Sequence, residues 1–577
     1  MKAPVATRPR TVLDALTQAA DNPSNPSYNF LADGERLVRR LSCADLGSRA
    51  RDVAAALGPD RRGERVILPH RAGLDFVIAY FGCLYAGAIA VPVPPPNNRH
   101  TGSERLRLVA ADSGASVLLC AAKDTPEMAA IAQPLDVSVI ASDDLPHGLG
   151  AEWPGPAVDA DQIIHLQYSS GSTGTPKGVI MRHSEVIDQL SYYQRLSKAD
   201  SRTGIVSWLP SFHDLGLVTG VLLPAFLQSS VWLMDPLSFV RSPLRWLSAI
   251  SEYRAGLTAA PNFAYDLCVR RATPERCQGL DLRWLHFALN GAEPVRAGTL
   301  DQFVATFGPY GFCRRALSPG YGLAEATLIV TGTPRDSEPT IVRADDSALR
   351  SGVYREAADG ARSRDLVASG HTDEAVQVAI ADPGTLSPRP DGQVGEILVS
   401  GSVVASGYWA DDEATARTFR ARPPGRGDSD WLRTGDLGFL MNGELFVTGR
   451  LKDVVIVDGL NHYSHDIERT VEASHSAIRP ERSIVFAVED GQSERVIVVA
   501  EVERRGLRDD SGTAGVARDP DAATNEVITA VRRAVAEEHG VAVAEIVLLR
   551  SSRVPLTSSG KRRRLQCRDD FLAGALR

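Results

Sequence analysis

A stretch of small, hydroxylated residues and glycines is the first part of the sequence that could do chemistry. It reads Tyr168-Ser-Ser-Gly-Ser-Thr-Gly-Thr-Pro-Lys-Gly178 and follows an apolar run at 163–167. Glycines permit backbone turns that a Cβ would forbid, and hydroxyls with exposed amides form a concave acceptor site for phosphate oxygens. The pattern therefore predicts a phosphate-binding loop formed by Ser169, Ser170, Gly171, Ser172, Thr173, Gly174, Thr175 and Lys177.

This loop differs from the Walker A motif, because Pro176 precedes Lys177 where that motif requires glycine. A flexible Gly/Ser linker is the alternative interpretation. The order of residues and the expected position between a strand and a helix favour a phosphate loop.

Five further segments follow in order along the chain. They are Leu289-Asn-Gly-Ala-Glu-Pro294, Pro319-Gly-Tyr-Gly-Leu-Ala-Glu-Ala-Thr327, Trp431-Leu-Arg-Thr-Gly-Asp-Leu-Gly438, Gly449-Arg-Leu-Lys-Asp453 and Val554-Pro-Leu-Thr-Ser-Ser-Gly-Lys561. Together with the loop they resemble the adenylate-forming superfamily of acyl-CoA synthetases, peptide-synthetase adenylation domains and luciferases. The resemblance spans nearly the whole chain and implies ATP as a substrate and Mg²⁺ as a cofactor.

The resemblance also implies roles for single residues. Tyr321 would stack on the purine, Glu325 would bind Mg²⁺ and assist catalysis, and Asp436 would accept hydrogen bonds from both ribose hydroxyls. An aromatic face suits a base, a hard carboxylate oxygen suits Mg²⁺, and a carboxylate is a natural acceptor for a cis-diol. The remaining nucleotide contacts implied are Asn290, Gly291, Ala292, Glu293, Gly320, Gly322, Leu323 and Arg450. A surface acid and a turn cap are the structural alternatives for Glu325 and Asp436.

Two lysines carry the rest of the implied mechanism. Lys561 matches the family's catalytic lysine, whose point charge bridges the attacking carboxylate and the α-phosphate. Lys452 matches the hinge about which the small C-terminal domain pivots after the first half-reaction. A solvated side chain is the alternative for Lys452, and a nuclear-localisation signal is the alternative for the basic run 561–564.

Several segments resemble one branch of this superfamily, the fatty acyl-AMP ligases. They are Trp208-Leu-Pro-Ser-Phe-His-Asp-Leu-Gly216, Ala260-Pro-Asn-Phe-Ala-Tyr-Asp266, Asn461-His-Tyr463 with Asp466-Ile-Glu468, and Cys567-Arg568. The branch places the equivalent of His213 where the acyl carboxylate meets ATP, although a structural histidine is the alternative. It implies a fatty acid substrate and transfer to an acyl carrier protein or to a carrier domain of a polyketide or peptide synthase. Residues 218–227 and 231–234 are expected to line the acyl tunnel.

The segment 342–366 matches, by position and length, a branch-specific insertion thought to restrict the domain movement or access that coenzyme A needs. An ordinary surface loop is the alternative. Three other functions stay open: a fatty acyl-CoA ligase using free coenzyme A, an amino-acid-activating domain with Asp214 as its ammonium-binding acid, and a non-catalytic nucleotide-binding protein. The presence of Lys561, Glu325 and Asp436 argues against the last.

Alternating helices and strands must position these residues. Helices at 43–57 and 75–85 and short apolar strands at 64–68, 88–93, 117–120, 163–168, 203–208 and 230–234 indicate an α/β fold with parallel sheets. Short strands at 375–380, 395–400 and 444–447 indicate a β-rich subdomain. We expect a large N-terminal domain, 1–450, of two α/β subdomains plus the β-rich subdomain 375–450, and a small mobile α+β domain, 451–577. The polar stretch 504–525 reads as an exposed loop.

Composition excludes several other classes of protein. The net charge is −8 and the only dense basic run is 561–564, which argues against nucleic acid as a partner. Seven scattered cysteines without zinc spacing and an N-terminus without a signal-peptide pattern favour reduced thiols in a cytoplasmic protein. The apolar window 74–93 contains Asp75 and Pro92, so we expect a buried helix and strand rather than membrane insertion.

Overall fold

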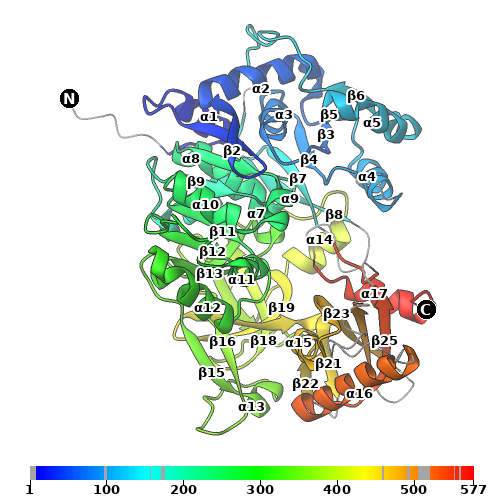
Figure 1. The fold of residues 1–577 in the computed structure, drawn as a ribbon. Coiled ribbons are helices and arrows are strands. Elements are labelled where there is room, and N and C mark those ends of the chain that lie inside the picture. The colour runs from blue at the N-terminus through cyan, green and yellow to red at the C-terminus, as the bar shows by residue number, and fades with distance from the viewer. Residues whose placement is uncertain are drawn as a thin grey trace.

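The computed structural model describes residues 8–96, 100–155, 158–169, 176–457, 460–489, 494–503, 520–550, 553–557 and 561–576. Its N-terminal elements form a tall body, and the C-terminal elements lie against the lower part of that body, between α14 and α13 (Figure 1). The predicted α/β fold, with a smaller α+β part at the C-terminal end, is confirmed.

Two large, mostly parallel sheets form the N-terminal body. The eight-stranded sheet has the order β14-β13-β12-β11-β9-β10-β1-β2 and is parallel except for its two edge strands, β14 and β2. The six-stranded sheet has the order β6-β5-β3-β4-β7-β8 and is parallel except for β8. The strands of the first are β1 (Ser27–Ala32), β2 (Arg36–Ser42), β9 (Ile205–Ser207), β10 (Val231–Met234), β11 (Leu257–Ala260), β12 (Phe287–Asn290), β13 (Leu317–Gly322) and β14 (Ile329–Gly332). Those of the second are β3 (Arg65–Leu68), β4 (Ile89–Pro92), β5 (Val117–Cys120), β6 (Ser138–Ala141), β7 (Ile163–Ser169) and β8 (Lys177–Arg182).

Helices cover the faces of these sheets and bury them in one large apolar cluster and a second, smaller cluster on the six-stranded sheet. They are α1 (Val12–Ala20), α2 (Cys43–Leu57), α3 (Leu74–Tyr85), α4 (His100–Ser113), α5 (Thr125–Ala132), α6 (His183–Ser197), α7 (Asp214–Leu217), α8 (Leu223–Leu227), α9 (Pro236–Arg241), α10 (Leu244–Glu252), α11 (Asn262–Arg271) and α12 (Ala297–Phe307). A capping box between Ser42 and Asp45 fixes the start of α2, which has the predicted bounds. The apolar window 74–93 folds into α3 and β4, and no helix in the described ranges is long and apolar enough to cross a bilayer.

The β-rich region contains a four-stranded antiparallel sheet in the order β17-β18-β19-β20. Its strands are β17 (Val376–Ala381), β18 (Gly395–Gly401), β19 (Leu432–Met441) and β20 (Glu444–Arg450), with α14 (Asp412–Phe419) between β18 and β19. Before it, the segment 342–366 is not an ordinary loop. It forms most of an antiparallel pair, β15 (Ile341–Asp345) and β16 (Ser363–Val367), with α13 (Asp346–Arg350) between the strands.

The C-terminal part begins after a 3₁₀ turn at Leu451–Asp453 and has its own apolar clusters. It contains β21 (Val454–Val457), β22 (Leu460–Tyr463), α15 (Ser464–Ser474), β23 (Ile478–Glu489), β24 (Glu494–Val502), α16 (Pro520–His539), β25 (Val543–Arg550) and α17 (Arg564–Leu572). The loop predicted over 504–525 is wrong at its end, because α16 starts at Pro520, a residue suited to the first helical turn. Residues 504–519 lie outside the described ranges. The division after Arg450 stays a prediction.

Candidate functional site

The carboxyl ends of four neighbouring parallel strands carry a large share of the predicted site. Strand β9 leads to His213, β12 leads to Asn290 and Glu293, and β13 leads to Tyr321 and then Glu325. Strand β11, between β9 and β12, leads into α11 and Asn262. In open α/β sheets ligands bind at the carboxyl ends of the strands, so the topology gathers residues that are far apart in the sequence.

The predicted phosphate loop connects two antiparallel strands, β7 and β8. The expected position between a strand and a helix is therefore wrong, since β8 precedes α6. Ser170, Gly171, Ser172, Thr173, Gly174 and Thr175 lie outside the described residues, as does the side chain of Ser169. Lys177, where β8 begins, is described: its Nζ lies 3.4 Å from Oδ2 of Asp411 and 4.8 Å from the ring centre of Tyr408.

Glu325 lies in the 3₁₀ turn that follows β13, and its Oε1 accepts a hydrogen bond of 2.9 Å from the Tyr408 hydroxyl. Burial raises the pKa of this carboxyl group above its usual value. A buried carboxylate of this kind gains stability from a nearby cation. The described residues hold no cluster of three or more metal-binding side chains, but Mg²⁺ commonly uses one or two protein carboxylates together with phosphates and water. Glu325 therefore fits a magnesium ion.

Asp436 is the centre of a second cluster. It is only 6% exposed, its Oδ2 accepts a hydrogen bond of 2.8 Å from the Tyr321 hydroxyl, and its Oδ1 accepts one of 3.0 Å from Nε of Arg450. Arg450 is its cross-strand partner on β20. The Thr434 hydroxyl holds the backbone amide of Asp436 at 3.1 Å. A carboxylate has about four acceptor positions, so these two bonds leave capacity for a diol.

The segment 290–293 begins at the last residue of β12. It is closely packed, and its backbone is strained. Asn290 is fully buried and donates to Oδ1 of Asn262 at 3.4 Å. A Cβ on Gly291 would lie 2.8 Å from the carbonyl oxygen of Gly320, and Ala292 has a φ of +64°. Left-handed backbone at a residue other than glycine costs roughly 1–3 kcal/mol and is concentrated at functional sites.

Glu293 and the glycines of β13 form one side of the predicted nucleotide site together with Asn290 to Ala292, and this side is called the nucleotide wall. Oε1 of Glu293 accepts a hydrogen bond of 2.5 Å from the backbone amide of Phe263, and burial raises the pKa of Glu293. A Cβ on Gly322 would lie 1.6 Å from the carbonyl oxygen of Leu328, so only glycine fits there. Leu323 is half-buried where the turn bearing Glu325 begins. These residues lie together, while their contacts with a nucleotide stay a prediction.

His213 directly precedes the short helix α7, whose first residue is Asp214. Its Nδ1 lies 2.9 Å from Oδ1 of Asp214, which also accepts a hydrogen bond of 2.7 Å from the backbone amide of Leu215. Gln167, on the strand that leads to the phosphate loop, donates to the carbonyl oxygen of Phe212 at 2.9 Å. The His213 turn is therefore attached to the strand before that loop, and Asp214 already binds His213 and a helix amide.

Lys561 belongs to the C-terminal part, yet its surroundings include residues of the N-terminal body. Its backbone amide donates to the Thr557 hydroxyl at 2.9 Å. Loss of hydration and the nearby charge of Arg450 lower the pKa of Lys561. The carboxylates of Asp214, Glu293 and Asp436 act in the opposite direction but do not cancel the decrease. Lys561 is exposed, and its charge lies within electrostatic range of three of the predicted segments.

Two features of the site were missed by sequence reasoning. Tyr408 and Asp411, which surround Glu325 and Lys177, come from the β-rich region and border a cavity of about 340 Å³ with Asp112, Pro176, Lys177, Trp409 and Arg417. Asn262, which links α11 to Asn290, lies in the segment 260–266, but the sequence predicted no role for it. Gly407 is a local sequence feature that indicates a turn before Tyr408, and its φ is +147°. Lys452 lies in the 3₁₀ turn after β20, and its role as a hinge stays a prediction.

Comparison with known proteins agrees with this geometry. Residues 16–409 match the family described as AMP-binding enzyme, and residues 452–577 match the AMP domain described as Disco-interacting protein 2-like. A medium-chain-fatty-acid–[acyl-carrier-protein] ligase, JamA of Moorena producens, is 40% identical over 98% of this chain and 96% of its own. A long-chain-fatty-acid–AMP ligase, FadD26 of Mycobacterium marinum, is 36% identical over 97% and 96%.

Solved structures give the same result. A structure from a study of fatty acyl-adenylate ligases of E. coli and L. pneumophila is 30% identical, with a TM-score of 0.86 and 98% of each chain covered. The L. pneumophila fatty acyl-adenylate ligase in complex with acyl adenylate and pyrophosphate is 34% identical, with a TM-score of 0.75 over 98% of this chain and 96% of that one. This chain is a ligase that belongs to the AMP-binding enzyme family, in the group of the fatty acyl-AMP ligases.

Proposed function

We propose that this protein activates a fatty acid with ATP as an acyl-adenylate, releases pyrophosphate, and transfers the acyl group to the phosphopantetheine thiol of an acyl carrier protein or carrier domain. The observation that carries the proposal is the contact of Asp436 with Tyr321 and Arg450, and the charge of Lys561 lies within electrostatic range of Asp214, Glu293 and Asp436. This one positive charge would act on the ribose, adenine and acyl sides of the predicted site. The names of the relatives support the fatty acid and the carrier protein as substrates.

In the first half-reaction the fatty carboxylate attacks the α-phosphorus, the bond to the β-phosphate oxygen breaks, and pyrophosphate leaves. Lys561 offsets the negative charge that accumulates between the two anions, and Asp436 orients the ribose. The 169–175 loop and Lys177 hold the phosphates that depart. Bound at Glu325, Mg²⁺ would neutralise phosphate charge. The protein needs no nucleophile of its own, because the substrate carboxylate supplies it.

In the second half-reaction the pantetheine thiol attacks the acyl carbonyl, its proton is lost, and AMP leaves. Lys561 must withdraw to admit the thiol, so the C-terminal part is expected to rotate about Lys452. The acyl chain would lie along the predicted lining of 218–227 and 231–234. These residues form a π-helical turn (Val218–Leu222), α8 and β10, and most of them are buried.

The segment 342–366 supports a carrier protein over free coenzyme A. Its arginines reach the C-terminal part: Arg350 donates to the carbonyl oxygen of His539 at 2.7 Å, and Arg362 lies 3.2 Å from Oε1 of Glu538. Arg364 pairs with Asp466 and lies 5.1 Å from the ring centre of Tyr463. These contacts restrict how freely the C-terminal part moves, as the proposed gating role requires.

The proposal is tested with purified protein, ATP, Mg²⁺ and fatty acids of several chain lengths. We expect pyrophosphate release that depends on the fatty acid, and acyl transfer to a pantetheinylated carrier protein well above transfer to free coenzyme A. Efficient acyl-coenzyme A production would instead identify a coenzyme-A ligase. Release of pyrophosphate with amino acids but not with fatty acids would overturn the choice of substrate.

A further inference from the structure

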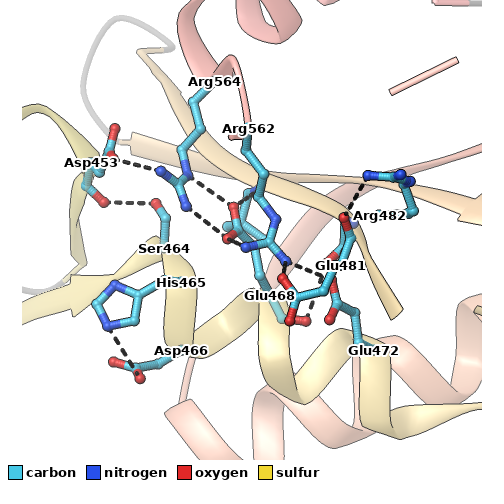
Figure 2. A network of polar contacts seen from close by, with 12 residues as sticks. Asp453, Ser464, His465, Asp466, Glu468, Glu472, Glu481, Arg482, Arg562 and Arg564 are labelled. Carbon is cyan, nitrogen blue, oxygen red and sulfur yellow. Dashed lines mark hydrogen bonds and ion pairs between the residues drawn. The ribbon is translucent and has the colours of Figure 1, made fainter. Parts of the chain in front are cut away.

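The residue after Lys561 is held by a cluster of three carboxylates. Nη2 of Arg562 lies 2.9 Å from Oε1 of Glu472 and 3.0 Å from Oε2 of Glu481, and its Nη1 lies 3.5 Å from Oε2 of Glu468 (Figure 2). Glu468 is fully buried, and its other oxygen accepts a hydrogen bond of 3.0 Å from the backbone amide of Val485. The position of Arg562, and with it that of Lys561, is therefore fixed by these acids.

Arg564 extends the cluster to the turn that contains Lys452. Its guanidinium donates twice to Glu468, at 2.9 and 2.7 Å, and lies 2.5 Å from Oδ2 of Asp453 (Figure 2). The Ser464 hydroxyl donates to the carbonyl oxygen of Asp453 at 2.7 Å. These contacts all lie within the C-terminal part, so they are kept when that part moves as a body.

Glu481 of this cluster also binds a charged residue of the N-terminal body. Its Oε1 lies 3.2 Å from Nη2 of Arg296. Glu481 has a φ of +60° and lies where the pairing of β23 with β24 is interrupted, between Ile478 and Ser483. A strained bulge therefore holds its carboxylate between two arginines, one from each part of the molecule.

Arg296 is itself attached to the predicted nucleotide wall. It lies three residues after Glu293, and its backbone amide donates at 3.2 Å to Oδ1 of Asn262, the atom that also accepts from Asn290. The contacts therefore run from Asn290 through Asn262, Arg296 and Glu481 to Arg562, which is adjacent to Lys561. The two arginines, with Arg270, hold the pKa of Glu481 below its usual value although burial alone would raise it.

We propose that Arg296 and Glu481 form a latch that positions Lys561 for adenylate formation and is released for acyl transfer. Rotation of the C-terminal part separates Glu481 from Arg296 but leaves Glu481 with Arg562, so the Arg296 contact belongs to one orientation. Both are positioning residues, since neither is placed against a substrate. The inference rests on the proposed function, because it concerns the first half-reaction of that function.

The test compares the two half-reactions in Arg296→Gln, Glu481→Gln and the double variant. Adenylation is followed in a single turnover by pyrophosphate release, and transfer by adding preformed acyl-adenylate and a pantetheinylated carrier protein. The pair is partly exposed, 39% and 34%, so the effect of Arg296→Gln should be modest: about threefold slower adenylation with transfer unchanged or faster. Glu481→Gln also weakens the hold on Arg562 and should slow adenylation about tenfold.

The double variant should be no slower than Glu481→Gln, because the two side chains act through one contact. Arg296→Lys should restore most of the rate, since it keeps the positive charge. Arg315→Gln is the matched control: it removes an arginine–glutamate contact of similar length, 3.4 Å, to Glu338 within the N-terminal body. It should leave the adenylation rate within about twofold of the unchanged protein.

Several results would overturn the latch. They are equal slowing of both half-reactions, no slowing in either single variant, additive effects in the double variant, or an equal loss of adenylation in Arg315→Gln. Thermal unfolding of each variant separates misfolding from mispositioning, and Arg296→Gln stays informative if Glu481→Gln fails to fold, because Arg296 lies outside the carboxylate cluster. If the unchanged protein makes no acyl-adenylate from any fatty acid, the proposed function itself fails rather than the latch.

Discussion

The Tyr321 hydroxyl donates a hydrogen bond of 2.8 Å to Oδ2 of Asp436, so the residue expected at the purine and the residue expected at the ribose are in direct contact. Arg450 approaches the other oxygen of the same carboxylate. The orientation of Asp436 is therefore set before any nucleotide binds, which lowers the entropic cost of binding the ribose.

Asp436→Ala should raise the KM for ATP by about ten- to a hundredfold, because hydrogen bonds to a charged group contribute about 1.5–3 kcal/mol. Tyr321→Phe keeps the ring and removes one hydroxyl, so it should raise the KM for ATP only a few-fold. Steady-state kinetics with ATP varied measure both. The matched control is Tyr354→Phe, since Tyr354 stacks on Phe439 away from this site. An unchanged KM in Asp436→Ala would contradict the ribose role.

Glu325→Gln should raise the Mg²⁺ concentration needed for half-maximal adenylation by at least about tenfold. Burial raises the pKa of Glu325, and this sets the direction in which the requirement for Mg²⁺ changes with pH. Protons and Mg²⁺ compete for one carboxylate, so the requirement for Mg²⁺ should increase as the pH falls toward that raised pKa. Glutamine does not titrate, so the variant should lack this part of the pH dependence. Identical magnesium titrations at each pH would exclude Glu325 as a ligand.

Arg350 and Arg362 donate hydrogen bonds to the last carbonyl groups of α16. The segment 342–366 is therefore attached directly to the C-terminal part. Such guanidinium contacts satisfy carbonyls that a helix end leaves unpaired. Replacing both arginines by glutamine, or shortening the segment, should increase acyl transfer to free coenzyme A several-fold while adenylation continues. The ratio of acyl-coenzyme A to acyl carrier product measures this. An unchanged ratio in a folded, adenylating variant would count against gating.

Local patterns in the sequence were sufficient for much of the fold. The capping box at Ser42 and the apolar spacing behind it give α2 its predicted bounds, and the apolar run of β5 was also located correctly. The structure of 342–366 was not anticipated, because β15 and β16 are short and carry charged residues that read equally well as a loop. The pairing of β1 with β10 joins strands about 200 residues apart, which no local pattern specifies.

The site was predicted only as far as its motifs extend. Glu325 and Asp436 could be predicted as site residues because each lies within a recognisable segment, and Asp436 contacts two other predicted residues, Tyr321 and Arg450. The partners Tyr408 and Asp411 were missed because they approach from the β-rich region, and Arg296 and Glu481 because charged residues near turns usually face solvent. Such contacts join segments that are far apart in the sequence, so they are set by the tertiary structure and not by a local pattern.

The most direct test of the account is the Lys561→Ala protein, assayed separately for its two half-reactions. Because Lys561 supplies positive charge only during attack on the α-phosphorus, we expect adenylate formation to fall about a hundred- to a thousandfold. Transfer from added acyl-adenylate to a pantetheinylated carrier protein should stay close to that of the unchanged protein. Lys198→Ala, which removes a surface lysine paired with Asp336, is the control. Acyl-adenylate formed at full rate by Lys561→Ala would contradict the central claim.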